Sequence, residues 1–374
     1  MAAPLRPDSV DALCAVIADA AQRGDKLRLR GGGSKDAIGA PTPDAQIVDM
    51  SAFSGVIDYD PPELVLTVGA ATPLTEVLAL VAERNQMLAF DPFDHAAMLG
   101  GTAGQATIGG VIAAGVAGPL RLSRGAARDH LLGFTAVSGR GERFVAGAKV
   151  VKNVTGYDLS KLITGSWGRL AAITELTLKV LPAPNVRRTL AVRGLDPVAA
   201  VAAMARAMGS PAEVSAAAHL PDADGGPLTL IRLDGFPSSV DARAELLGRL
   251  IEGIAQLAED PWQAIATAAP LPDNIPLWRI IVPASRAPAL VERLPGQWLF
   301  DWAGGLVWLA SDAEAQAIRA AAADAGGHAM LVRADAAMRA SVPTLHPQPA
   351  PLAALEARVR HAFDPAGVFE TGRF

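Results

Sequence analysis

The chain has 374 residues, of which 51% are hydrophobic and 19% are charged. This length accommodates two ordinary domains, and the composition predicts well-packed cores rather than disorder. The formal net charge of −5 offers no basic excess to neutralise phosphates, which argues against a nucleic-acid-binding protein.

The N-terminus lacks a charged segment followed by an apolar stretch, and no apolar run approaches the roughly 20 residues that a transmembrane helix needs. We therefore expect a cytoplasmic protein that contacts a membrane, if at all, peripherally and through partners. Cys14 is the one cysteine, so an intrachain disulfide is excluded, as is a self-contained iron–sulfur cluster, which usually needs several thiolates. Cys14 lies on the apolar side of a predicted helix, which favours a buried structural thiol over a reactive one.

The first half is predicted to contain short strands and helices. Asp8 or Ser9 can cap a helix over about 10–22, which Gly24 would end. Alternating apolar residues predict further elements: strands at 26–30, 47–49, 55–59 and 63–69, a helix from Thr72, and a hairpin of 131–137 and 143–145.

The stretch from Gly100 to Gly118 is rich in glycine and carries no charged residue. A solvated linker of this glycine content would normally contain serine, asparagine or charge. The apolar composition instead predicts backbone packed closely against a flat neighbour, either a strand or a ligand.

After Pro182-Ala183-Pro184, strands and helices alternate, which predicts an α+β arrangement with two βαβ-type units on one antiparallel sheet. The tail carries a further predicted helix at 351–363. The expected strands are 189–192, 228–233, 278–282, 297–302 and 306–309, and the expected helices are 197–208, 239–256, 286–294 and 312–325.

The glycines at 31–33, directly after the first predicted strand, are the first candidate site. Consecutive glycines let several backbone N–H groups converge on an anion such as a diphosphate. A P-loop is excluded because the chain has no Gly-Lys-Ser/Thr tripeptide. A Rossmann fingerprint is excluded because the prolines at 41 and 43 prevent a helix after the glycines, although Asp49 lies near the offset of its ribose-binding acid. A diphosphate nest between strands and a plain flexible turn both stay open.

Two further glycine-containing regions, 101–118 and 165–168, follow in order, with Lys152-Asn153-Val154-Thr155-Gly156-Tyr157-Asp158 before the second of them. Together with Arg30-Gly31-Gly32-Gly33-Ser34-Lys35 and Asp364-Pro365-Ala366-Gly367-Val368-Phe369, this order resembles the FAD-binding domain of the vanillyl-alcohol oxidase and p-cresol methylhydroxylase superfamily. Within it, the chain is most similar to the smaller FAD-binding subunits of bacterial glycolate oxidase (glycolate dehydrogenase) complexes.

The resemblance covers essentially the whole chain and implies a two-part FAD-binding domain, 1–182 with a C-terminal return at 346–374, and an α+β cap domain at 185–345. In the implied site, the first loop wraps the diphosphate and the second glycine region follows the diphosphate and ribityl chain. The implied FAD-binding residues are Arg30, Gly31, Gly32, Gly33, Ser34, Lys35, Gly101, Thr107, Ile108, Gly109, Gly110, Ala114, Gly115, Gly118, Gly168 and Ile173.

Several positions depart from the family pattern. Arg169 and Ala171 replace the usual threonine and glycine of the third motif, and the C-terminal asparagine of the family is lost. Ser34 stands near the place where covalently flavinylated members carry histidine, so the implied FAD is noncovalent. Lys152 is a candidate for stabilising the negative charge of reduced flavin. The alternative is a structural role, in which its side chain caps backbone carbonyls of its own loop.

No metal site is expected. His219, His328, His346 and His361 are scattered through the second half, without the paired-histidine motif of related D-2-hydroxy-acid dehydrogenases. Arg279 and Arg333 could bind a carboxylate, although surface solvation explains them equally well. Core packing or a subunit interface is favoured over a flavin-stacking role for the tryptophans at 298, 302 and 308.

The resemblance implies an FAD-dependent oxidoreductase subunit that acts in the oxidation of glycolate or a similar 2-hydroxy acid. A companion FAD-binding catalytic subunit would supply the substrate site, and an iron–sulfur subunit would accept electrons. Two alternatives stay open: a free-standing FAD oxidoreductase with its own substrate, and a flavin-free scaffold subunit. The intact glycine motifs argue against the scaffold, because a site without a ligand has no need of them.

Overall fold

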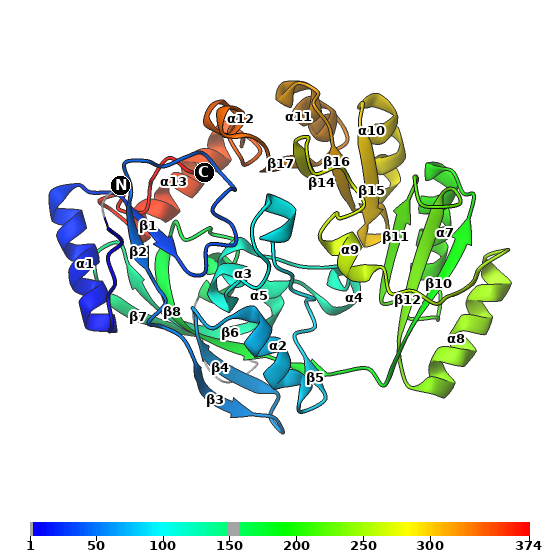
Figure 1. The fold of residues 1–374 in the computed structure, drawn as a ribbon, viewed down its shortest axis with the longest axis horizontal. Coiled ribbons are helices and arrows are strands. Elements are labelled where there is room, and N and C mark those ends of the chain that lie inside the picture. Colours follow the sequence, from blue (N-terminus) through cyan, green and yellow to red (C-terminus); the bar gives the residue numbers. More distant parts are fainter. Residues whose placement is uncertain (1–2, 148–156) are drawn as a thin grey trace. The chain divides into compact units, whose positions relative to one another are not determined.

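The computed structural model describes residues 3–147 and 157–374. It divides into two compact units (Figure 1): unit 1 comprises 1–117, 125–182 and 347–374, and unit 2 comprises 118–124 and 183–346. Residues 118–124 thus group with unit 2, although they fall within the predicted 1–182 domain.

Unit 1 is built on a five-stranded antiparallel sheet in the order β3-β4-β8-β6-β7. The central strand β8 was not predicted; it pairs with β4 on one side and β6 on the other, and nearly all of its side chains are buried. The predicted hairpin of β6 and β7 is confirmed. The strands are β3 (Val56–Asp60), β4 (Val65–Gly69), β8 (Ala171–Lys179), β6 (Leu131–Ser138) and β7 (Arg143–Gly147).

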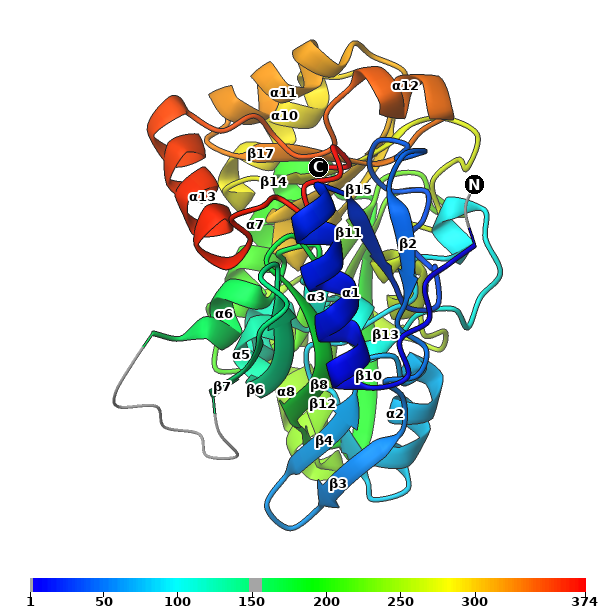
Figure 2. The same ribbon diagram turned by 90° about the vertical axis from the view of Figure 1, so that its left-hand side faces the viewer.

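A second, parallel pair of strands, β1 (Leu27–Arg30) and β2 (Gln46–Asp49), follows helix α1 (Val10–Arg23). The side chain of Ser9 caps α1, and Gly24 ends it with φ 75°. The buried face of α1 packs with residues of β1, β2 and the C-terminal tail, and Figure 2 shows these elements together. Half-buried Cys14 belongs to this region, and burial raises the pKa of its thiol, which disfavours the reactive thiolate.

Part of the glycine-rich stretch forms helix α3 (Ile108–Ala114), which was not predicted. The expected close packing is nevertheless present, because a Cβ added to Gly109 would lie 2.6 Å from the carbonyl oxygen of Ala70. The other elements of unit 1 are α2 (Leu74–Ala82), β5 (Gln86–Met87), η1 (Ala97–Leu99), α5 (Ala127–His130), α6 (Leu159–Ile163), β9 (Leu181–Pro182) and α13 (Ala350–Phe363).

Unit 2 contains an eight-stranded sheet in the order β13-β10-β12-β11-β15-β16-β14-β17, in which every pairing is antiparallel. It consists of two βαββαβ units with matching strand order, joined where β11 meets β15, so the expected α+β class is confirmed. The first unit is β10 (Val186–Arg193), α7 (Pro197–Met208), β11 (Ala216–Leu220), β12 (Leu228–Gly235), α8 (Pro237–Leu250) and β13 (Ala255–Leu257). The second is β14 (Leu277–Ile281), α10 (Ala287–Arg293), β15 (Gln297–Asp301), β16 (Leu306–Ala310), α11 (Ala315–Asp324) and β17 (His328–Arg333).

The prediction of one helix over 239–256 was wrong at its C-terminal end. Helix α8 stops at Leu250, because Ile251 is extended and Gly253 has φ 73°, and the chain then forms strand β13. Strands β11 and β17 were also missed. Short elements complete unit 2: α4 (Arg121–Arg124), α9 (Trp262–Ala266), η2 (Ala284–Arg286), η3 (Trp302–Gly304) and α12 (Ala336–Ser341).

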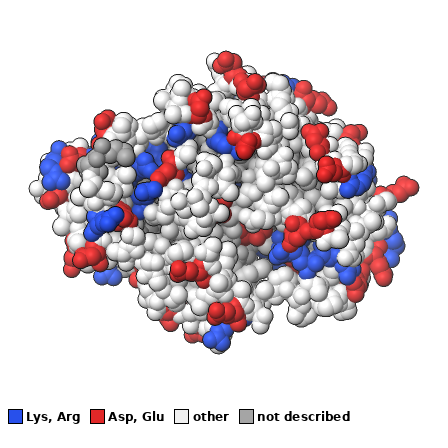
Figure 3. Space-filling model, viewed as in Figure 1, with Lys and Arg blue, Asp and Glu red and all other residues white. Residues whose placement is uncertain are grey.

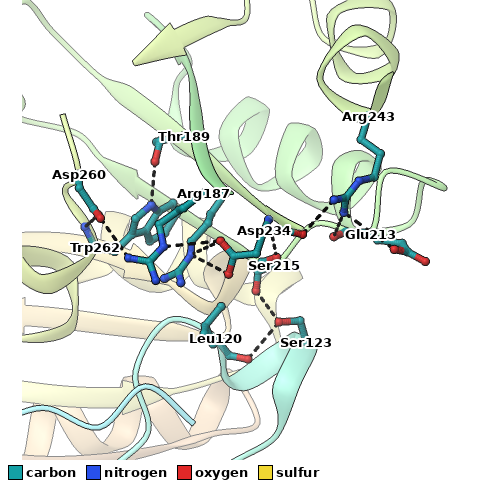
Figure 4. Close-up of polar contacts among 11 residues, drawn as sticks. Leu120, Ser123, Arg187, Thr189, Glu213, Ser215, Asp234, Arg243, Asp260 and Trp262 are labelled. Atoms are coloured by element: carbon teal, nitrogen blue, oxygen red, sulfur yellow. Dashed lines mark hydrogen bonds and ion pairs between the residues drawn. The ribbon is translucent and has the colours of Figure 1, made fainter. Parts of the chain in front are cut away.

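The two faces of the unit 2 sheet differ in chemistry. Ile231 and Leu233 of β12 pack in the apolar core with the helices, so the intervening Arg232 and Asp234 lie on the other face. Both charged side chains are buried, and the Nε of Arg232 donates to the Asp234 carboxylate at 3.0 and 3.2 Å. Figure 4 shows how Arg187 extends this network from β10 to Asp260, with an ion pair of 3.1 Å. These ion pairs and hydrogen bonds offset the desolvation cost of burying the two charged side chains.

Candidate functional site: a glycine-lined cleft in unit 1

A cleft of about 1100 Å³, its solvent-open mouth included, lies within unit 1. Four chain segments converge on it: β1 with the loop that follows, the start of α3, the turn before β8, and the C-terminal tail. Its lining comprises 27–36, Met50, Ala70, Ala71, Thr107, Gly109, Gly110, Ala113, Ala114, 167–169, Ala171, Ile173 and 369–374.

The first loop is packed directly against the segment that precedes α3. A Cβ on Gly32 would lie 2.0 Å from the carbonyl oxygen of Gln105, and one on Gly31 would lie 2.6 Å from the hydroxyl of Thr107. Gly33 adopts φ 86°, which a side chain would strain. These glycines therefore let two backbone segments meet at one wall of the cleft, and the following Ser34 and Lys35 are buried there.

Helix α3 presents its first turn to the cleft. The Thr107 hydroxyl accepts a hydrogen bond from the backbone N–H of Gly110 at 3.3 Å, which is a typical N-cap contact. Gly109 allows the close approach to Ala70, and Ala113 and Ala114 carry only methyl groups toward the cleft. The wall is thus formed largely by backbone and by very small side chains.

The turn before β8 forms another wall. Trp167 and Gly168 both have positive φ, 57° and 74°, and the Trp167 N–H donates to the carbonyl of Ala113 at 2.7 Å. The Trp167 ring lies 4.8 Å from that of Phe374, centroid to centroid. Strand β8 begins at Ala171, so the departures from the family pattern at 169 and 171 leave this turn and strand intact.

The C-terminal tail closes the remaining side. The Asp364 carboxylate accepts the N–H groups of Val368 and Phe369 at 2.8 and 2.7 Å. The Val368 carbonyl in turn accepts the Leu27 N–H at 2.8 Å, which fastens the tail to β1. Further along, the Nε of Arg373 donates to the Ile38 carbonyl at 2.8 Å. The Asp-Pro-Ala-Gly-Val-Phe motif therefore places residues 369–374 at the cleft.

The charged side chains of the cleft lining are five basic and two acidic. Asp36 pairs with Arg28 at 2.5 Å and Arg30 at 2.8 Å, and Glu370 pairs with Arg169 at 3.2 Å. The lining is therefore net positive. Figure 3 shows Lys and Arg side chains and Asp and Glu side chains distributed over the drawn molecular face. A local excess of positive charge next to convergent backbone N–H groups suits a phosphorylated ligand.

Most of the residues proposed from the sequence come together in this cleft: Arg30, Gly31, Gly32, Gly33, Ser34, Lys35, Thr107, Gly109, Gly110, Ala114, Gly168 and Ile173. Four others do not line it. Gly101 lies in the loop before α3, Ile108 points into the core, Gly115 ends α3 with φ 63°, and the Gly118 carbonyl accepts the Trp302 indole N–H in unit 2. Lys152 lies outside the described residues.

The sequence analysis did not identify Arg28, Asp36, Trp167 or the tail residues as lining. The alternation of Arg28 and Arg30 with leucines on β1 was a usable signal, because it places both arginines on one strand face. Nothing in the local pattern indicates that the tail returns to this strand, since the contact spans most of the chain.

The four histidines considered for metal binding occupy unrelated positions, three in unit 2 and His361 in α13 of unit 1. His219 is fully buried and its Nδ1 lies 2.9 Å from the Thr229 hydroxyl, and burial lowers the pKa of His219 to about 4. The rings of His328 and His346 are 6.5 Å apart, and His361 is exposed. In the described part of the chain, no three His, Cys, Asp or Glu side chains are grouped as a metal site would require.

The two arginines considered for carboxylate binding differ. Arg333 donates to the backbone carbonyls of Pro272 and Ile275, a structural arrangement. Arg279 stacks on Trp302 at 5.0 Å, and Arg121 stacks on the same indole at 4.5 Å. Burial, followed by the charge of Arg121, lowers the pKa of Arg279 to about 10. Of the three tryptophans at 298, 302 and 308, Trp302 and Trp308 are buried in unit 2 and Trp298 is half-buried.

Comparison with known proteins agrees with this geometry. Residues 1–147 match a family described as an FAD binding domain. Solved structures of alkyldihydroxyacetonephosphate synthase superpose with a TM-score of 0.68 over 97% of this chain and 74% of theirs, at 15% identity. The fold and cleft thus define an FAD-binding domain of the p-cresol methylhydroxylase type, joined to an α+β unit.

The sequence relatives narrow this class. The chain is 36% identical to the glycolate oxidase subunit GlcE of Escherichia coli (strain K12), over 93% of this chain and 92% of that protein. It is 27% identical to the glycolate oxidase subunit GlcD of Bacillus subtilis, and 30% identical to a D-lactate dehydrogenase of Archaeoglobus fulgidus; these matches span 38% and 40% of the relatives. The chain belongs to the GlcE family of glycolate oxidase subunits. No helix in its described part is both long and apolar enough to cross a membrane.

Proposed function

We propose that this chain is the FAD-binding subunit of a complex that oxidises glycolate or a related 2-hydroxy acid. The observation that carries the proposal is the likeness to GlcE over nearly the whole of both chains, together with a glycine-lined cleft in the matching domain. In this proposal, unit 1 is the FAD-binding domain and unit 2 the cap domain, and the complex acts at the cytoplasmic side of the membrane.

The residues of the cleft fit FAD. Backbone N–H groups of the loop 31–35 and the first turn of α3 would hold the diphosphate, and the net positive lining would balance its charge. Small side chains at Ala113 and Ala114 leave room for a flat ring or ribityl chain beside α3. When bound, FAD supplies the capacity to accept and release electrons.

Noncovalent attachment is part of the proposal. The residues that line the cleft include no His, Cys or Tyr within the described parts of the chain, and these are the side chains that form covalent flavin bonds. Ser34, near the place of the histidine in covalently flavinylated relatives, is buried beside Lys35.

We further propose that this subunit relays electrons. Oxidation of a 2-hydroxy acid to the 2-oxo acid releases two electrons and two protons, which a companion FAD-binding catalytic subunit would accept from the substrate. The present subunit would assist transfer of the electrons to an iron–sulfur subunit. The dispersed histidines of unit 2 support this division, because the paired-histidine site of self-sufficient relatives is not assembled in the described residues. Lys152 stays a candidate for stabilising reduced flavin.

An absorbance spectrum of the purified chain tests the proposal. We expect the purified chain to show a flavin spectrum, and we expect denaturation to release the flavin from the protein. It should stay oxidised under anaerobic glycolate or D-lactate, and should bleach once the companion catalytic subunit is added. Bleaching by substrate in the isolated chain would favour a free-standing oxidoreductase instead. Failure to bind flavin from excess FAD would leave the scaffold alternative.

A further inference from the structure

Lys35 is a buried lysine inside the cleft, directly after the glycine loop. The residue is 9% exposed, and a Cβ built on Gly110 of α3 would lie 3.9 Å from its Nζ. Across residues 3–147 and 157–374, Nζ makes one hydrogen bond, a long contact of 3.4 Å to the Ser34 hydroxyl, and no ion pair. A charged amine in this position has lost water without gaining a counter-ion.

The charged groups around Lys35 do not compensate for this burial. Asp94 raises the lysine pKa, but its carboxylate accepts backbone N–H groups of the loop 96–106 rather than pairing with the amine. Arg373 of the tail lowers the pKa, and the α3 side contributes the uncharged Thr107 and Gly110. Burial is the largest effect, and the pKa of Lys35 is lowered to about 8.

We propose that the Lys35 side chain is the counter-charge for the diphosphate of the bound dinucleotide, and that diphosphate binding is coupled to proton uptake by this amine. The inference rests on the proposed FAD function and assigns to that site an amine whose charge depends on pH and on the bound diphosphate. The loop offers directional N–H groups, whereas a lysine offers a compact charge that tolerates several phosphate orientations.

The coupling gives the pH dependence a definite sign. In the free protein, the Lys35 amine loses its proton as the pH passes about 8. An anionic diphosphate raises its pKa, since an opposite charge favours the protonated form. The complex therefore holds more protons than the free protein in alkaline solution. FAD affinity should fall as the pH rises above about 8, by up to about tenfold per pH unit.

The test is isothermal titration of FAD into the flavin-depleted full-length chain, in two buffers of different ionisation enthalpy at each pH. The difference in heat between buffers gives the number of protons taken up. We expect proton uptake that increases from pH 7 to pH 9 and approaches one proton per FAD, because the free pKa is about 8 and the bound pKa is much higher.

Two variants separate charge from shape. Lys35→Met should bind FAD about 10- to 100-fold more weakly at pH 7, as expected for loss of a charged hydrogen bond, with no proton uptake. Lys35→Arg keeps a charge that does not titrate in this range, so its affinity should stay close to wild type at pH 7 without uptake at pH 9. Lys161→Met, which removes an exposed lysine paired with Asp158, should behave as wild type.

The result that overturns the inference is FAD binding with no proton uptake at pH 8 and 9, or with uptake that persists in Lys35→Arg. If Lys35→Met does not fold, Lys35→Arg alone decides. ADP, which carries a diphosphate but no flavin, separates this inference from the proposed function. Uptake on ADP binding that Lys35→Arg abolishes supports the inference even if FAD does not bind. Absence of binding by both ligands overturns both proposals.

Discussion

Gly31 and Gly32 illustrate how single residues determine the shape of this cleft. Their lack of a side chain is required first by the protein itself, because the loop backbone touches Gln105 and Thr107. A ligand at the same wall then meets N–H groups whose positions are already set. The glycines therefore preorganise the site, and their substitution should affect stability and ligand affinity together.

Gly32→Ala tests this dual role. The added Cβ would lie 2.0 Å from the Gln105 carbonyl oxygen, so one backbone segment must shift. We expect a loss of about 1–3 kcal/mol in unfolding free energy, typical of overpacking, and FAD affinity lowered by at least about tenfold. Denaturant unfolding and FAD titration measure the two effects.

Gly248→Ala is the matched control. Gly248 lies in α8, and a Cβ there meets nothing within 4 Å. Alanine should raise stability by about 0.5–1 kcal/mol through helix propensity and leave FAD binding unchanged. Equal FAD affinity in Gly32→Ala and Gly248→Ala would contradict the role assigned to the loop.

At the scale of elements, the C-terminal tail is the part of unit 1 with the most distant sequence origin. The buried carboxylate of Asp364 holds the turn that carries Val368 and Phe369 to β1. Hydrogen bonds to a charged acceptor contribute about 1.5–3 kcal/mol each. One side chain thus positions residues 369–374 at the cleft.

Asp364→Ala should release the tail, with an expected loss of about 2–4 kcal/mol in unfolding free energy and weaker FAD binding. Asp335→Ala removes a carboxylate that also accepts a backbone N–H, that of Met338, but at the exposed start of α12. It should cost about 1 kcal/mol without affecting FAD. A folded Asp364→Ala protein with wild-type FAD affinity would show that the tail is dispensable for binding.

At the scale of the whole molecule, the cleft belongs to one of the two units. Each unit has its own sheet, and the residues that line the cleft all come from unit 1. A bound ligand raises the free energy of every opening reaction that would release it. At a free ligand concentration of 100 times Kd, this increase is about 2.7 kcal/mol. The two units should therefore respond differently to FAD.

Hydrogen exchange measured by mass spectrometry tests this expectation. Added FAD should slow exchange in β1 and its loop, α3, the turn at 167–169 and the tail, while exchange in β14 and β16 of unit 2 should change little. Equal protection in both units would mean that they open together. No protection in either unit would contradict FAD binding in the cleft.

Local sequence determined much of this protein. Period-two alternation was sufficient to predict the β6–β7 hairpin and the strands β15 and β16, and the caps Ser9 and Gly24 were sufficient to predict α1. These features depend on residues close together in the chain, where hydrophobic periodicity and capping residues predict local structure directly. The glycines at 31–33 by themselves left a diphosphate nest and a plain turn open, and FAD was implied by the resemblance that the order of the motifs carries.

Tertiary structure decided the rest, because the deciding contacts join distant residues. Helix α3 forms in a glycine-rich segment of poor helix propensity, where packing on Ala70 and the Thr107 cap override that propensity. The return of residues 369–374 to β1 and the uncompensated burial of Lys35 likewise depend on segments hundreds of positions apart. The chain sequence thus determined the chemistry available at the cleft, and long-range packing decided which groups meet there and with what charge.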